Sequence, residues 1–256
     1  MKSLARLSLP LVVAAMALSM LPNAAQAAKV TPTIRKDTST GAAYSGKFQA
    51  LSISEVYFSG NAPFIGLVDT TCQYGQIRGA VNSNGTGGSV NYVQIDNNGS
   101  GAACPNNQGG TTTITAVSTV GTGTVYFEND LPTAKVQDGY LDIPGNQSGV
   151  HLKAEISMPD VTTDLQTCHY GLTADTPTLS LNLYNKDNPG RPNHTTGQPG
   201  LNEAQGQANG QEFYLMPTET NDIYCPEAAA AYVTVQVKGE AVANSGTYNQ
   251  TLYITG

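Results

Sequence analysis

The sequence predicts an all-β fold built from antiparallel β-sandwiches. Short runs rich in Val, Ile, Thr, Tyr and Phe recur along the 256 residues, and turn-forming pairs such as Asn-Gly and Asp-Gly separate them. Several runs alternate: Val233, Val235 and Val237 fall on one face, and the polar residues between them fall on the other. A period of two is typical of a strand with one buried face. Many short strands separated by tight turns favour an antiparallel sandwich.

The strands can be placed along the chain from these runs and turns. A short helix is possible at residues 227–231, because this stretch is rich in alanine, although one turn is too short to be stable alone. The expected strands cover residues 47–59, 64–74, 89–95, 111–120, 124–128, 150–157, 178–184, 212–216, 231–237 and 248–255.

The N-terminus has the pattern of a secretory signal peptide. Two positive charges precede the apolar residues 7–21, a stretch of the length expected for a signal core. Ala25-Gln26-Ala27 then supplies small residues at both recognition positions, which predicts removal of residues 1–27. An uncleaved membrane anchor is the alternative, but the apolar stretch is short for a span of about 20 residues. We expect no membrane span after cleavage.

The four cysteines that follow fit an exported protein. An even number of cysteines after a secretory signal favours disulfides, because exported compartments are oxidising. Of the three possible pairings we prefer Cys72–Cys104 and Cys168–Cys225, since each closes a loop within one half of the chain. A metal site is the alternative, disfavoured because no Cys-x-x-Cys pair is present. The expected location is extracellular, at the cell surface or in the periplasm.

A weak internal repeat predicts two tandem, related sandwich units. Thr-Cys-x-Tyr-Gly occurs at Cys72 and Cys168, and Cys-Pro occurs at Cys104 and Cys225. We therefore expect units at residues 28–131 and 132–256, with one larger sandwich as the alternative. The second unit carries a polar insertion at 185–211, which is expected to be either a recognition loop or a surface excursion. Its charged residues are Lys186, Asp187, Arg191 and Glu203.

Composition and motifs exclude several functions. The chain has 12 Lys+Arg against 19 Asp+Glu, a net charge of −7, so it is a poor candidate for binding nucleic acid through phosphates. The sequence has no Gly-x-Ser-x-Gly elbow, His-Glu-x-x-His motif or phosphate-binding loop. Each of its three histidines, His151, His169 and His194, is better explained as structural or solvated. We therefore expect no enzymatic activity and no cofactor.

The acidic residues support only weak hypotheses. Glu155, Asp160 and Asp164 lie close in sequence, and paired carboxylates can hydrolyse glycosides. Solvated loop acids are the better explanation. A second set lies in or beside Asn/Gly-rich loops and offers oxygen ligands for Ca²⁺, namely Asp96, Asp138 and Asp142. Because these acids reproduce no known calcium-loop spacing, we expect no metal site.

Two stretches resemble bacterial fimbrial subunits of the chaperone–usher and spore-coat-U kind. Residues 58–60 (Phe-Ser-Gly) followed by 66–72 (Gly-Leu-Val-Asp-Thr-Thr-Cys) look like the first-strand pattern of those proteins. Residues 244–256 are similar to their closing strand, in which Gly-x-Tyr precedes alternating apolar residues. The resemblance implies an immunoglobulin-like or pilin-like sandwich that accepts a strand from a partner, a form of β-augmentation.

These observations favour a structural or adhesive protein of the bacterial cell surface or extracellular matrix, as a fimbrial or biofilm-matrix component. The expected partners are other copies of the chain or other surface subunits. The alternative is a periplasmic or secreted module that binds carbohydrate or another ligand, with exposed tyrosines stacking on sugars. The absence of Trp weakens that alternative, since Trp is the best stacking platform. A secreted hydrolase has no motif in its favour.

Overall fold

The fold is all-β, as the sequence predicts. The computed structural model describes residues 29–118, 121–128, 137–145, 150–174 and 176–256, so the predicted signal peptide at 1–27 lies outside the described residues. Seventeen strands are found in that part of the chain. They are β1 (Lys29–Val30), β2 (Thr33–Lys36), β3 (Gly46–Ser52), β4 (Val56–Ala62), β5 (Gly66–Cys72), β6 (Tyr74–Val81), β7 (Gly88–Asp96), β8 (Cys104–Pro105), β9 (Thr111–Ala116), β10 (Thr122–Glu128), β11 (Gly139–Pro144), β12 (His151–Ile156), β13 (Gln166–Gly171), β14 (Thr178–Tyr184), β15 (Ala204–Leu215), β16 (Ala228–Glu240) and β17 (Tyr248–Thr255). Among the described residues, no helix has the length and apolar character needed to cross a membrane.

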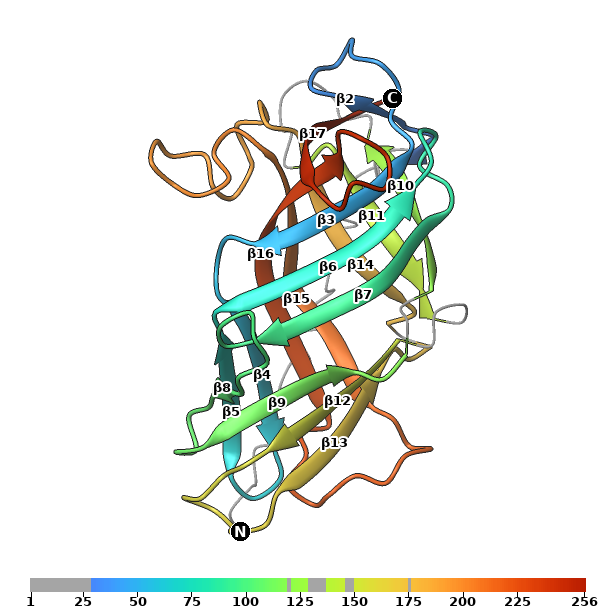
Figure 1. The fold of residues 1–256 in the computed structure, drawn as a ribbon. Helices are drawn as coiled ribbons and strands as arrows, with labels where there is room; N and C mark the ends of the chain where they lie inside the picture. The colour runs from blue at the N-terminus through green and yellow to red at the C-terminus, as the bar shows by residue number, and fades with distance from the viewer. Residues whose placement is uncertain (1–28, 119–120, 129–136, 146–149, 175) are drawn as a thin grey trace, which may run out of the picture.

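Eight strands close into an antiparallel barrel, which forms the upper half of the molecule in Figure 1. The pairing runs from β3 through β6, β7, β10, β11, β14, β15 and β16, and β16 pairs again with β3. This ring is referred to as the upper barrel. Its interior is filled by alternating apolar side chains such as Phe48, Val125 and Leu141, which leave a cavity of only about 90 Å³. A closed ring therefore takes the place of the two packed sheets of a sandwich.

A second group of strands, the lower ring, continues the same sheet below the barrel (Figure 1). Strand β4 pairs with β16 and β5, and β9, β12, β13 and β15 pair in that order. The β4–β5 pair meets the series that begins with β9 at two contacts. Thr70 of β5 forms a backbone bridge with Asn106, and the hydroxyl oxygens of Thr70 and Thr112 lie 2.8 Å apart. The long strands β15 and β16, of 12 and 13 residues, run through both halves.

The two halves of the molecule do not coincide with the predicted units 28–131 and 132–256. Strands from both sides of residue 131 alternate in each half: β10 pairs with β11 and β16 with β3 in the upper barrel, while β9 pairs with β12 and β16 with β4 in the lower ring. Both disulfides also lie in the lower ring, because Cys72 ends β5, Cys104 begins β8 and Cys168 lies in β13. The repeated cysteine motifs therefore do not mark one disulfide for each half.

Two local predictions are wrong. The polar insertion predicted at 185–211 is a loop only up to residue 203, because β15 begins at Ala204, where Ala204 and Ala208 are buried. The possible helix at 227–231 is also strand, since β16 begins at Ala228 and lies between β15 and β4. Pairing on both edges outweighs the helical preference of alanine there.

Gln205 explains how a strand of such polar composition is buried. Its side chain is fully buried, and its Oε1 accepts a hydrogen bond from the Asn193 amide at 3.0 Å. Its Nε2 donates to the carbonyl oxygens of Asn193 and Gly200, at 2.8 and 3.0 Å. One glutamine thus satisfies three backbone groups of the loop at 185–203 and holds that loop against β15.

We expect Gln205→Ala to release the loop from the barrel. Leaving these buried backbone groups unpaired should lower the free energy of unfolding by about 2–3 kcal/mol and speed cleavage within residues 186–200. Urea unfolding and limited proteolysis measure the two effects. Gln207→Ala is the matched control, because Gln207 lies two residues along the same strand and accepts one long bond, 3.4 Å, from Tyr184. Equal cleavage rates in both variants would contradict the anchoring role.

Candidate functional site

The four cysteines form the two pairs that sequence analysis prefers. Cys72 bonds Cys104 with Cα atoms 4.9 Å apart, and Cys168 bonds Cys225 with Cα atoms 5.6 Å apart. All four are buried. Two buried disulfides indicate an oxidising, extracytoplasmic environment.

Two of the three histidines meet across strands β12 and β13. His151 Nε2 and His169 Nδ1 lie 2.8 Å apart, so one ring donates a proton and the other accepts it. The third, His194, lies in the 185–203 loop with its Nδ1 3.0 Å from the Arg191 carbonyl oxygen. Sequence reasoning did not anticipate the His151–His169 pair, whose members are 18 residues apart.

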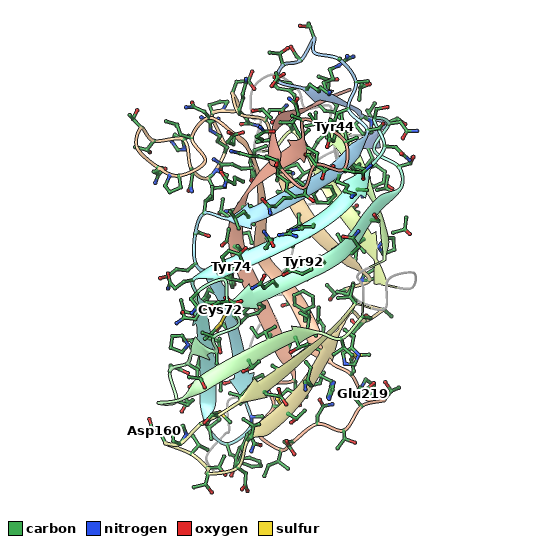
Figure 2. The ribbon with its side chains drawn as sticks, in the orientation of Figure 1. Tyr44, Cys72, Tyr74, Tyr92, Asp160 and Glu219 are labelled. Atoms are coloured by element: carbon green, nitrogen blue, oxygen red, sulfur yellow. A yellow bond between two sulfur atoms is a disulfide. The ribbon has the colours of Figure 1, made fainter. Side chains whose placement is uncertain are left out.

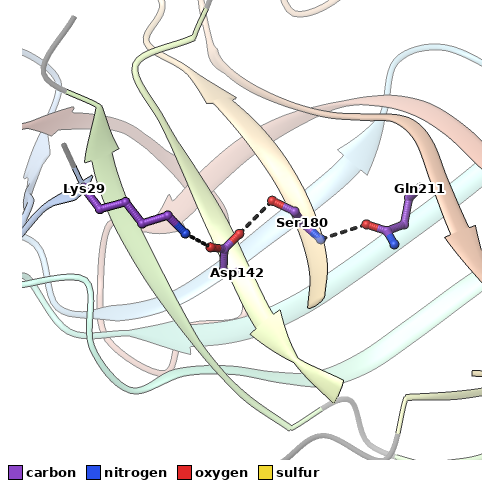
Figure 3. A network of polar contacts seen from close by, with 4 residues as sticks. All are labelled: Lys29, Asp142, Ser180 and Gln211. Atoms are coloured by element: carbon purple, nitrogen blue, oxygen red, sulfur yellow. Dashed lines mark hydrogen bonds and ion pairs between the residues drawn. The ribbon is translucent and has the colours of Figure 1, made fainter. Parts of the chain in front are cut away.

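The candidate acids serve separate structural networks. Asp142 binds Lys29 Nζ at 2.6 Å and accepts a hydrogen bond from Ser180 Oγ at 2.7 Å, while the Ser180 amide donates to Gln211 (Figure 3). The hydrogen bond to Asp142 raises the pKa of Lys29. Asp138 is buried and accepts hydrogen bonds from the Asn185 amide and the Asn188 side chain, at 2.7 and 2.8 Å.

The remaining acids do not converge on a catalytic or metal site. Glu155 forms an ion pair with Lys153 at 3.1 Å, and Asp160 and Asp164 lie in the exposed connection between β12 and β13 (Figure 2 labels Asp160). In the insertion, Asp187 accepts a hydrogen bond from Tyr253. Across the described ranges, no group of three or more His, Cys, Asp and Glu side chains is placed to hold a metal ion.

Two neighbouring strands leave one edge unpaired. Strand β7 pairs with β6 throughout, but on its other edge only its first two residues pair with β10. Strand β9 pairs with β12, and on its other edge only its first two residues pair with β8. Within the described part of the chain, the edges of residues 91–96 and 113–116 have no ladder partner. Figure 1 shows these strands flanking the junction between the upper barrel and the lower ring.

A groove of about 280 Å³ lies between these edges. It is larger than the cavities inside the two halves and at their junction, which measure about 50, 90 and 100 Å³. Half-buried Val93, Ile95 and Ile114 line it and also pack against the core, whereas Thr113 and Thr115 are exposed. The β7–β9 groove, defined by residues 93–96, 101–103 and 112–116, thus joins an apolar floor to open backbone edges.

Asp96 fixes one end of the β7–β9 groove. Its carboxylate accepts hydrogen bonds from the backbone amides of Asn98, Gly99 and Gly101 and from Gln94 Nε2. Burial favours the neutral acid, but these hydrogen bonds outweigh it and lower the pKa of Asp96. Asp96 therefore orders the 97–103 turn in its ionised form. Its carboxylate oxygens are engaged by four hydrogen-bond donors, which is the arrangement of a structural turn and not of a metal site.

The geometry of the groove suits an added β-strand. Strands β7 and β9 approach each other closely over part of their length, so an extended segment would add to the open edge of one of them, and its alternate side chains would cover Val93, Ile95 and Ile114. Sequence reasoning identified the strands at 89–95 and 111–120 but not the groove. No sequence signal marks it, because an open edge is a property of strand pairing and not of either strand.

Comparison with known proteins identifies no relative for this fold. No protein-family model, no curated protein and no solved structure matches the chain. The fold, the disulfides and the β7–β9 groove are therefore the features from which a function can be inferred.

Proposed function

We propose that the protein is an exported structural or adhesive component of the bacterial cell surface or extracellular matrix, and that it self-associates by strand addition. The β7–β9 groove is the observation that carries this proposal. An exposed strand edge is a template for another chain, and proteins that do not use such an edge usually cover or block it. Here two edges face one groove with an apolar floor.

The resemblance to fimbrial subunits agrees with this use of the groove. In an incomplete immunoglobulin-like sandwich a partner supplies the missing strand; in this chain the groove between β7 and β9 offers the equivalent opening in a barrel. We propose other copies of the chain as the partner, with other subunits of the same surface structure as the alternative. The proposed location is outside the cell or at its surface, where two buried disulfides are stable.

The experiment compares assembly of the wild-type protein with that of two lysine variants. We expect Ala116→Lys to reduce assembly by about tenfold, because a charged side chain lining the groove must remain hydrated and so keeps a strand out. Val117→Lys is the control, since Val117 is the next residue, half exposed and outside the groove lining. Light scattering over a concentration series and negative-stain electron microscopy measure the assembled fraction.

Two results would contradict self-association through the groove. Wild-type protein that stays monomeric at every concentration would remove other copies as the partner. Ala116→Lys that assembles as well as Val117→Lys would show that assembly uses another surface.

A second function is favoured by a different surface. The outer face of the upper barrel carries Arg78 beside several tyrosines and glutamines, which fits the alternative of a secreted carbohydrate-binding module.

A further inference from the structure

A cluster of polar and aromatic side chains covers the outer face of the upper barrel, away from the β7–β9 groove floor. Arg78 of β6 pairs with Gln49 of β3 on one side and with Tyr92 of β7 on the other. Outward positions alternate along β6, so Tyr74, Gln76 and Arg78 share this face. Figure 2 shows Tyr74 and Tyr92 on the same face of the barrel. With Tyr248 of β17, they form the Arg78 cluster: Gln49, Tyr74, Gln76, Arg78, Tyr92 and Tyr248.

Arg78 is held in place by aromatic rings and has no counter-charge in the part of the chain that the structure describes. Its guanidinium carbon lies 4.9 Å from the centre of the Tyr92 ring and 6.0 Å from that of Tyr248. Its Nε is buried without a hydrogen-bond partner. Among the described residues no carboxylate lies within ion-pair distance of Arg78. A restrained, unpaired guanidinium is suited to a carboxylate, which it can bind through two parallel hydrogen bonds.

The acid closest along β7 is already engaged. Asp96 pairs across the ladder with Tyr74, but its carboxylate is held by three backbone amides and by Gln94. Gln94 in turn accepts a hydrogen bond from the Tyr92 hydroxyl at 2.6 Å, which fixes the ring that contacts Arg78. The row of Tyr92, Gln94 and Asp96 therefore supports the cluster without neutralising Arg78.

Gln76 places a second polar group on the outer face beside Arg78. Its side chain is only 5% exposed, yet it makes no hydrogen bond with any described residue. Its polar atoms are not buried unpartnered atoms, unlike Arg78 Nε, so the amide is open to a ligand at the barrel surface. Gln49 on the adjacent strand is half buried and also lacks a side-chain partner in the described part of the chain. Two amides beside one guanidinium offer donors and acceptors for hydroxyl groups.

We propose that the Arg78 cluster binds an acidic saccharide. The carboxylate of a uronic acid pairs with Arg78, the ring hydroxyls hydrogen-bond to Gln49 and Gln76, and an apolar sugar face packs on a tyrosine ring of the cluster. An acidic rather than a neutral sugar is indicated because Arg78 has no carboxylate partner among the described residues. This site is independent of strand addition, and either proposal can fail without the other.

Calorimetric titration with an oligogalacturonate tests the proposal. We expect binding that weakens as salt is added. Arg78→Gln should raise Kd about tenfold or more and Arg78→Lys should have an intermediate effect, because a lysine keeps the charge and loses the bidentate geometry. Lys186→Gln removes one positive charge from the 185–203 loop and should leave Kd unchanged. A carboxyl-reduced oligomer of the same length should bind about tenfold more weakly.

Three outcomes would overturn the acidic-saccharide site. These are no binding of the oligogalacturonate at millimolar concentration, equal binding by Arg78→Gln and Lys186→Gln, or equal affinity for the acidic and carboxyl-reduced oligomers. Thermal unfolding of each variant shows whether it is folded. If Arg78→Gln does not fold, Gln49→Ala replaces it, and unchanged affinity in that variant contradicts the proposal.

Discussion

Replacing Cys168 and Cys225 together with alanine is expected to lower the free energy of unfolding by about 4 kcal/mol. The disulfide joins residues 57 positions apart, and closing a loop of that length removes much of the entropy of the unfolded chain. It also ties the start of β16, a strand shared by both halves, to β13 in the lower ring. Urea unfolding of the oxidised proteins measures the loss.

The other disulfide supplies the matched comparison. Cys72–Cys104 spans 32 positions, so the chain-entropy relation gives a slightly smaller loss, between about 3 and 4 kcal/mol. A loss below about 1 kcal/mol for either double variant would contradict a stabilising role that arises from loop closure. When both disulfides are removed, the lower ring should unfold at a lower urea concentration than the upper barrel, because the eight strands of the upper barrel contain no cysteine.

Replacing Asp96 with asparagine is expected to cost about 3 kcal/mol at pH 7. The carboxylate accepts hydrogen bonds from three backbone amides and Gln94, and hydrogen bonds to an ionised acceptor are about twice as strong as neutral ones. An asparagine would place its own NH₂ group against these donors. Asp164→Asn is the control, because Asp164 is exposed.

The lowered pKa of the Asp96 carboxylate also predicts that its contribution to stability decreases at acidic pH. Since the pKa of Asp96 is lowered in the folded state, its contribution is fully present above its unfolded pKa of about 3.9. It is lost as the pH falls through the lower folded pKa. The stability difference between wild type and Asp96→Asn should therefore narrow on acidification below about pH 4 and stay constant from pH 5 to 7. A constant difference down to pH 2 would contradict this assignment.

Local strand pattern predicts much of this fold. Strands β14 and β17 have the predicted bounds, 178–184 and 248–255, because both combine β-branched or aromatic residues with clear turns at their ends. The predicted strand at 47–59 is in fact two, β3 and β4, with a break at residues 53–55 that carries the chain from the upper barrel into the lower ring. Both parts pair with β16, so one predicted strand serves two halves.

Closure and the interleaving of the halves depend on contacts that the sequence pattern does not contain. A sandwich and a barrel use the same alternating strands and turns, and only the pairing of β16 with β3 distinguishes them here. Only the end of strand β15 is predicted, at 212–216. Its first part, residues 204–211, is assigned to the polar insertion because Gln205, Gly206 and Asn209 have the composition of a loop; its burial is possible because the 185–203 loop satisfies Gln205. The β7–β9 groove and the Arg78 cluster likewise arise from neighbours distant in sequence.

We expect another chain to pair with the open strand edges at the β7–β9 groove. Hydrogen–deuterium exchange of the monomer and of the assembled protein tests it most directly, because it reports on the backbone amides themselves. We predict that in the monomer the amides of residues 91–96 and 113–116 exchange faster than those of β16, which pairs along both edges, and that they gain protection on assembly. Assembled protein in which these two segments exchange as they do in the monomer, while another surface becomes protected, would contradict the claim.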